Sequence, residues 1–182
     1  MSPAPTVWTL GHSTRPIDEF IGLLRAHQIR LLVDVRTVPR SRYNPQFNTD
    51  QLAQSLRDAG LRYRHFPALG GLRKPKKHSV NDGWRNTSFR GYADYMQTDE
   101  FLNALEELMA DSRLQPTAIM CAEAVPWRCH RSLIADALVV RGWVSRHIMS
   151  ETKADPHKLT SFAHLENGML SYPKQTDPSS LF

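Results

Sequence analysis

Both cysteines of the chain lie in one short segment that also carries acidic, imidazole and guanidinium groups. Cys121 and Cys129 are accompanied there by Glu123, His130 and Arg131. A thiol acts as a nucleophile in its thiolate form, which a nearby cation and a helix N-terminus both stabilise. The segment therefore predicts a thiol site in which Cys121, Glu123, Cys129 and His130 are catalytic and Arg131 holds an anionic group of the substrate. The sequence leaves open which cysteine is the nucleophile.

A strand and a helix are predicted on either side of this segment. Residues 117–120 are a short apolar run typical of a buried strand, and residues 132–142 have the apolar spacing of an amphipathic helix. In an open α/β sheet, ligands bind beyond the carboxyl ends of the strands, where a helix N-terminus offers N–H groups to an anion. The cysteine segment has this position.

Strand and helix patterns alternate along the rest of the chain. The predicted strands cover residues 6–10, 31–35, 61–66, 117–120 and 144–149. Right-handed crossovers through the intervening helices give a mostly parallel five-stranded sheet with helices on both faces, a Rossmann-like three-layer α/β fold. A length of 182 residues suits one domain. We therefore predict a single α/β domain over residues 1–182, with residues 151–182 as a C-terminal extension packing on it.

Further polar residues lie near the carboxyl ends of the first two predicted strands or in the loops that follow them. Because the carboxyl ends of parallel strands meet at one edge of a sheet, we expect these side chains to gather near the cysteines. Together with Arg131 they form the predicted substrate-binding set: His12, Ser13, Asp34, Arg36, Ser41 and Arg42.

Positive charge is concentrated in residues 36–90. This segment has twelve Lys or Arg against three Asp, a local charge of +9, which leaves about −4 for the rest of a chain whose net charge is +5. Its residues 67–92 are predicted to be a long basic loop with interleaved aromatic side chains, which can stack on nucleobases. Concentrated positive charge attracts anions. The predicted partner is therefore an anionic small molecule, including a nucleotide-like one, or a nucleic acid.

Two other classes of function remain open. A non-enzymatic nucleic-acid or nucleotide-binding protein would use the basic segment, but it would leave the cysteines unexplained. A metal-dependent hydrolase would draw its ligands from Cys121, Cys129, His130 and His12, with Glu123 activating a bound water. Against a metal site, Cys129 is followed directly by His130, which makes simultaneous ligation of one ion awkward.

A phosphatase-like or sulfurtransferase-like anion loop is a weaker alternative. Such loops have a Cys-x5-Arg spacing, whereas Cys121 and Arg128 are separated by six residues, none of them glycine. Loops without glycine wrap phosphate poorly, because the positive φ angles that they need are strained for other residues. The spacing therefore does not favour this type of loop.

Several features of the sequence bear on the cellular location of the protein and on which cofactors it could bind. No apolar run approaches 18 residues and the N-terminus lacks a signal-peptide pattern, so we expect a cytoplasmic protein without a membrane partner. Two cysteines are too few for a disulfide framework. Nothing resembles a Gly-x-Gly-x-x-Gly or Walker loop, and the sequence predicts no cofactor.

Motifs spread along the chain resemble one known family. They are TLGHST, DVRTVPRSRYNPQFN, LRYRHFPALGGLR, FRGYADYM, CAE followed by CHR, and GMLSYP. Over about residues 6–173 the sequence resembles the bacterial family called domain of unknown function 488 (DUF488). The resemblance implies an α/β fold and points to these motif positions: Gly11, His12, Ser13, Asp34, Arg36, Pro39, Ser41, Arg42, Gly70, Gly71, Cys121, Glu123, Cys129, His130 and Arg131. It implies no substrate or reaction, because the family is named for lacking an assigned activity.

Overall fold

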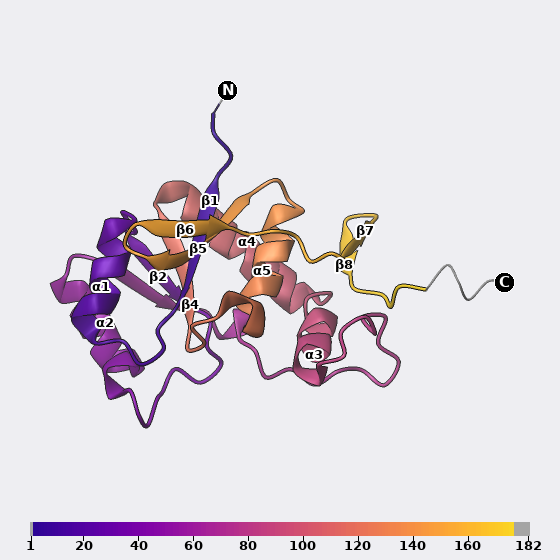
Figure 1. Cartoon of the computed structure of the whole chain (residues 1–182), viewed down its shortest axis with the longest axis horizontal. Helices are drawn as coiled ribbons and strands as arrows, with labels where there is room; N and C mark the ends of the chain where they lie inside the picture. The colour runs from indigo at the N-terminus through magenta and orange to yellow at the C-terminus, as the bar shows by residue number, and fades with distance from the viewer. Residues whose placement is uncertain (1, 177–182) are drawn as a thin grey trace.

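The strand that carries the first cysteine lies inside a six-stranded sheet. The computed structural model describes residues 2–176 (Figure 1). Its sheet consists of β1 (Thr6–Gly11), β2 (Leu31–Asp34), β3 (Arg62–His65), β4 (Thr117–Cys121), β5 (Val144–Ser150) and β6 (Lys153–Pro156). The strand order is β3-β2-β4-β1-β5-β6, and all neighbours are parallel except β5 and β6. The predicted mostly parallel α/β sheet is confirmed.

Helices cover both faces of this sheet, as predicted. They are α1 (Ile17–Ala26), α2 (Thr49–Asp58), α3 (Thr87–Tyr95), α4 (Asp99–Leu114) and α5 (Arg131–Val139). Successive strand residues point to opposite faces. Leu32 and Met120 accordingly pack in one core cluster with side chains of α1 and α2, and Val33 and Ile119 pack in another with side chains of α4 and α5. Figure 1 shows these two pairs of helices on opposite sides of the sheet.

The structure adds elements where we predicted a loop and an extension. Helix α3 begins inside the loop predicted over residues 67–92, because the Asn86 side chain accepts hydrogen bonds from the N–H groups of Ser88 and Phe89 and caps the helix. After β5 the chain turns back and β6 pairs antiparallel along its edge. Beyond β6 lies a hairpin of β7 (His164–Glu166) and β8 (Met169–Ser171). Residues 177–182 of the predicted extension lie outside the described residues.

The aromatic residues of the 67–92 segment pack against other aromatic side chains. The ring centroid of Trp84 lies 4.9 Å from that of Phe89, 4.8 Å from Phe162 and 5.5 Å from Tyr172. Tyr92 is fully buried. The segment is thus joined to the C-terminal extension by an aromatic cluster, and ring faces that we expected to stack on nucleobases contact the protein itself.

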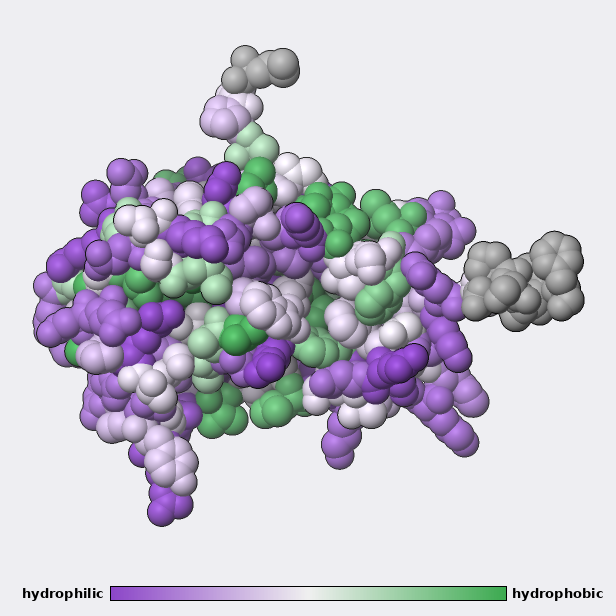
Figure 2. Space-filling view, viewed as in Figure 1, coloured by the Kyte–Doolittle hydropathy of each residue, from purple (hydrophilic) through white to green (hydrophobic). Residues whose placement is uncertain are grey.

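Several positive charges of the basic segment are also used inside the protein. Arg64 forms ion pairs with Glu107 at 2.8 Å and with Asp111, and the guanidinium of Arg73 lies 3.7 Å from the ring centroid of Tyr95. Other cationic residues of this segment are exposed: Arg40, Arg42, Lys74, Lys76, Lys77 and Arg85. Hydrophilic residues cover much of the face in Figure 2. Within residues 2–176, no helix is both long and apolar enough to span a membrane.

Candidate thiol site

Both thiols contact one buried arginine. Arg131, the first residue of α5, is only 1% exposed. Its Nε donates to the Sγ of Cys121 at 3.1 Å, and its backbone N–H donates to the Sγ of Cys129 at 3.5 Å. Its Nη1 donates to the hydroxyl of Thr9 at 3.0 Å, and its Nη2 donates to the carbonyl of Glu123 at 2.6 Å. The guanidinium is therefore fixed against the thiols, whereas the sequence suggested that it holds substrate.

The environment makes the two thiols unequal. Burial raises the pKa of Cys129, but its hydrogen bond with Cys121 and the charge and N–H groups of Arg131 outweigh burial and lower the pKa to about 6. The same hydrogen bond, together with burial, raises the pKa of Cys121. The two thiols therefore titrate as a coupled pair, and Cys129 is the more acidic of the two.

His130 lies beside the sulfur that ionises first. Its Nε2 is 3.0 Å from the carbonyl of Val35, and since a carbonyl can only accept, Nε2 carries the proton. The Nδ1 of the neutral ring is therefore the acceptor nitrogen, and it lies 3.7 Å from the Sγ of Cys129. Burial lowers the pKa of His130, which keeps the ring neutral. The structure thus places this imidazole nitrogen beside the sulfur of Cys129, and the catalytic role that the sequence predicts for His130 stays a prediction.

Glu123 contributes through its backbone. Its carboxylate accepts a hydrogen bond from the N–H of Val125 at 3.0 Å and shapes the turn, while its carbonyl receives Arg131. The position where a Cβ of Gly11 would stand is 1.9 Å from this carbonyl oxygen, so only glycine allows the end of β1 to lie this close. The structure thus gives the carboxylate of Glu123 a contact with the turn, rather than the proton-moving contact that we expected.

Replacing Gly11 with alanine is expected to displace the Glu123 carbonyl and destabilise the fold by roughly 1–3 kcal/mol, as overpacking does. Urea unfolding measures the effect. Gly22→Ala is the matched control, because the nearest atom to a Cβ there is the mobile Glu151 Oε1 at 3.3 Å. The control should stay within about 1 kcal/mol of the wild type. Equal stability of the two variants would show that the loop adapts without cost.

Three predicted binding residues form a buried cluster next to the thiols. Asp34 accepts hydrogen bonds from Arg36 Nε at 2.9 Å and Nη2 at 2.7 Å, and from the hydroxyl of Tyr63 at 2.6 Å. Arg36 Nη1 donates to Nε2 of His12 at 3.3 Å, and Nδ1 of His12 donates to the carbonyl of Ser13 at 2.8 Å. Burial lowers the pKa of His12 to about 4, so it is neutral at pH 7. The cluster is satisfied from within the chain.

Strand β1 connects this cluster to the cysteine loop. The backbone N–H of His12 donates to the carbonyl of Cys121 at 2.9 Å, and that of Ser13 donates to the carbonyl of Ala122 at 3.0 Å. Ser13 has φ 49°, a left-handed conformation that turns the chain toward α1. The predicted convergence of residues after β1, β2 and β4 is therefore present in the structure.

Ser41 and Arg42 lie farther along the loop after β2. The N–H of Ser41 donates to Asn48 Oδ1 at 2.7 Å, and its hydroxyl accepts from the N–H of Asn44 at 3.0 Å. Arg42 is exposed. No hydrogen bond or ion pair found within residues 2–176 links either of them to the cysteines.

The alternative of a metal centre used Cys121, Cys129 and His12. In the part of the chain that the structure describes, no group of three or more His, Cys, Asp or Glu side chains is arranged to hold a metal ion. His12 is turned toward Ser13 and Arg36, and the Cys121 sulfur faces Arg131. The arrangement of these side chains fits a thiol pair better than a ligand set.

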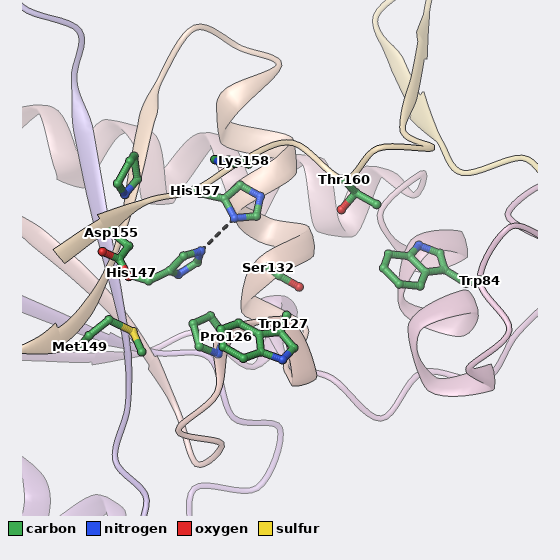
Figure 3. A pocket seen from close by; sticks show the side chains of 11 residues that line it. Trp84, Pro126, Trp127, Ser132, His147, Met149, Asp155, His157, Lys158 and Thr160 are labelled. Atoms are coloured by element: carbon green, nitrogen blue, oxygen red, sulfur yellow. Dashed lines mark hydrogen bonds between the residues drawn. The ribbon is translucent and has the colours of Figure 1, made fainter.

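A second set of buried or half-buried polar residues was not predicted from the sequence. Hydrogen bonds join Arg131 to Thr9 on β1 and Thr9 to His147 on β5. They continue from His147 to His157, after β6, and from His157 to Asp136 on α5. Only their three-dimensional proximity identifies them, since no spacing in the sequence relates them. Figure 3 shows His147 and His157 in the wall of a pocket of about 300 Å³, lined by Trp84, Pro126, Trp127, Ser132, His147, Met149, Asp155, Pro156, His157, Lys158 and Thr160.

Fold and site together define an α/β protein with a buried thiol pair held by an arginine at a helix N-terminus. The chain belongs to the DUF488 family, a domain of unknown function, whose model matches residues 16–138. The resemblance seen in the motifs is thereby confirmed. No curated protein and no solved structure matches the chain.

Proposed function

We propose that this protein is a thiol-dependent hydrolase or transferase whose nucleophile is the thiolate of Cys129. The observation that carries the proposal is that one buried residue, Arg131, contacts both thiols: its guanidinium Nε donates to Cys121, and its backbone N–H donates to Cys129. Burying an unpaired cation is costly, and the charge that compensates Arg131 is the thiolate. A structural cysteine has no need of such a partner.

The neighbouring groups fit the steps of nucleophilic catalysis. The Cys129 thiolate attacks an electrophilic centre of the substrate, forming an S-linked intermediate while the bond to the leaving group breaks. Because Cys129 attacks as a thiolate and His130 is neutral, the leaving group takes its proton from water, and Nδ1 of His130 then takes a proton from the water or second acceptor that displaces the sulfur. Water or a second acceptor then displaces the sulfur. Cys121, whose pKa is raised, keeps its own proton before attack, and its Sγ lies 3.9 Å from the carbonyl of Glu123.

The substrate class follows from charge. The exposed cations of residues 36–90 favour an anionic substrate, including one derived from a nucleotide or nucleic acid. Cys121 and Cys129 are only 4% and 5% exposed. Access of a substrate to either sulfur therefore requires local movement of the residues around them, and in the proposed mechanism Arg131 serves the thiolate instead of the substrate.

A non-enzymatic nucleic-acid or nucleotide-binding protein is the second candidate. The exposed cations Arg40, Arg42, Lys74 and Lys77 favour it. It ranks second because it gives no role to the thiol pair or to the buried arginine beside them, and because the aromatic rings around Trp84 pack on one another.

The rate of alkylation by iodoacetamide, followed for each cysteine by mass spectrometry as pH is varied, tests the proposed nucleophile. Because the pKa of Cys129 is lowered to about 6, its thiolate forms as pH rises through that value, and its alkylation should reach half-maximum there. Cys121 should react only at higher pH, since its pKa is raised. The urea-unfolded chain is the control and should react near the ordinary thiol pKa of about 8.5.

Two single variants separate the cysteines. Activity found by screening phosphorylated compounds should be lost in Cys129→Ser, whereas Cys121→Ser should retain part of it. A native Cys129 that reacts only at the pH of the unfolded chain, or activity that survives in Cys129→Ser, would refute the proposal.

A further inference from the structure

A continuous chain of hydrogen bonds leads from Arg131 to Asp136 through three side chains that contact neither thiol. Arg131 Nη1 lies 3.0 Å from Thr9 Oγ1, which lies 2.6 Å from Nδ1 of His147. Nε2 of His147 lies 2.8 Å from Nδ1 of His157, whose Nε2 lies 2.7 Å from Asp136 Oδ1. Figure 3 shows the contact between the two rings. The chain starts at a cation and ends at a fully buried carboxylate.

Only one arrangement of protons satisfies every bond with neutral rings. The Asp136 carboxylate accepts, so His157 carries its proton on Nε2 and accepts at Nδ1. His147 then donates from Nε2 and accepts at Nδ1, which fixes the hydroxyl proton of Thr9 toward His147. Burial lowers the pKa of His147 to about 4, which keeps this ring neutral in the pH range where Cys129 ionises.

The direction of these hydrogen bonds determines which part of the Thr9 hydroxyl faces Arg131. The Thr9 oxygen, with its proton committed to His147, presents a lone pair to Nη1 of Arg131. Hydrogen bonds in a chain polarise one another, and a terminal carboxylate strengthens the effect. With Thr9 on Nη1 and the Glu123 carbonyl on Nη2, the guanidinium plane is fixed and its Nε points at Cys121.

We propose that Thr9, His147, His157 and Asp136 are positioning residues that hold Arg131 against the thiol pair and thereby make Cys129 acidic. None of the four touches either sulfur in the hydrogen bonds found within residues 2–176. They act through Arg131. The inference rests on the proposed Cys129 thiolate.

Other titratable groups also face Cys129. They are Cys121 at the end of β4, His130 before α5, Arg131 in α5 and Tyr92 in α3. Variants that test the positioning role must leave all of these unchanged. Thr9 and His147, on β1 and β5, meet this condition.

The test is the pH dependence of Cys129 alkylation by iodoacetamide in Thr9→Val and Thr9→Ser. Valine has the shape of threonine but no hydroxyl, so Arg131 loses one of its anchors. The pH at which the alkylation rate is half-maximal, called the midpoint, should rise by about one unit. Alkylation should then be about tenfold slower at pH values below both the wild-type and the variant midpoint. Serine keeps the hydroxyl and should restore the wild-type midpoint.

A second variant, His147→Phe, protects the test against misfolding of Thr9→Val. It keeps a ring in place but removes the acceptor of the Thr9 hydroxyl, and its midpoint should also rise. Tyr172→Phe is the control, because its hydroxyl donates to Oδ2 of Asp136 at 2.7 Å and lies outside the chain. This control should lower stability in urea unfolding and leave the Cys129 midpoint unchanged.

The outcomes separate the two proposals. A low wild-type midpoint that stays the same in folded Thr9→Val and folded His147→Phe would overturn the positioning role and leave the nucleophile in place. If the Cys129 midpoint rises equally in Tyr172→Phe, general loosening of the core explains the rise, and the positioning role is also overturned. A wild-type midpoint near the ordinary thiol pKa would overturn both proposals.

Discussion

Replacing Arg131 with methionine is expected to slow the alkylation of Cys129 at about pH 6 by at least tenfold. An opposite charge within a few ångströms lowers the pKa of an acidic group by roughly 1–3 pH units, and methionine removes that charge. Burial, which raises the pKa of Cys129, then goes unopposed by the guanidinium. The half-maximum of the alkylation profile should therefore move above neutral pH, and any activity that depends on the thiolate should fall with it.

Arg131→Lys is the informative partner variant. A lysine ammonium keeps the charge but cannot contact the Cys121 sulfur, the Thr9 hydroxyl and the Glu123 carbonyl from one rigid plane. Its midpoint should lie between those of the wild type and Arg131→Met. If folded Arg131→Met had the same midpoint as the wild type, Arg131 would not stabilise the thiolate, and the proposed function would lose its main support.

The two arginine variants also bear on what could be learned from the sequence. The strands and their order of appearance were predictable, because buried parallel strands are short apolar runs such as residues 31–34 and 117–120. The grouping of Cys121, Cys129 and Arg131 was predictable as well, since they lie within eleven residues of one another. The role of Arg131 was not, because its orientation depends on Thr9, a partner 122 residues away in the sequence.

Elements with weak patterns were missed for a related reason. Strand β6 has four residues, two of them charged, and it exists because β5 offers an edge to pair with. Helix α3 depends on a single capping side chain, Asn86. No motif in the sequence marks His147 or His157. They form a hydrogen-bonded network only when β5 and the segment after β6 fold beside α5. Patterns over a few neighbouring residues predict the core and clusters of reactive residues, whereas polar networks between distant segments are seen only in the folded structure.

Replacing Arg36 with methionine is expected to destabilise the protein by about 3–5 kcal/mol, the usual cost of leaving one member of a buried ion pair alone. Asp34 is fully buried at the carboxyl end of β2, opposite Met120 of β4, and Arg36 neutralises it through two side-chain hydrogen bonds. Arg36 Nη2 also donates to the carbonyl of Phe47 at 2.7 Å, which ties the loop after β2 to the start of α2. Urea unfolding would measure the loss.

The double variant Asp34→Leu with Arg36→Met decides what the pair is for. Removing both charges leaves no unpaired ion, so a pair with only a structural role should give a double variant more stable than Arg36→Met alone. The cluster borders the thiol site through His12, whose Nε2 accepts from Arg36. If the double variant regains stability and keeps the wild-type Cys129 midpoint, the ion pair shapes the loop and takes no part in thiol chemistry. If stability returns but the midpoint or activity does not, Asp34 and Arg36 belong to the functional site, as their place after β2 first indicated.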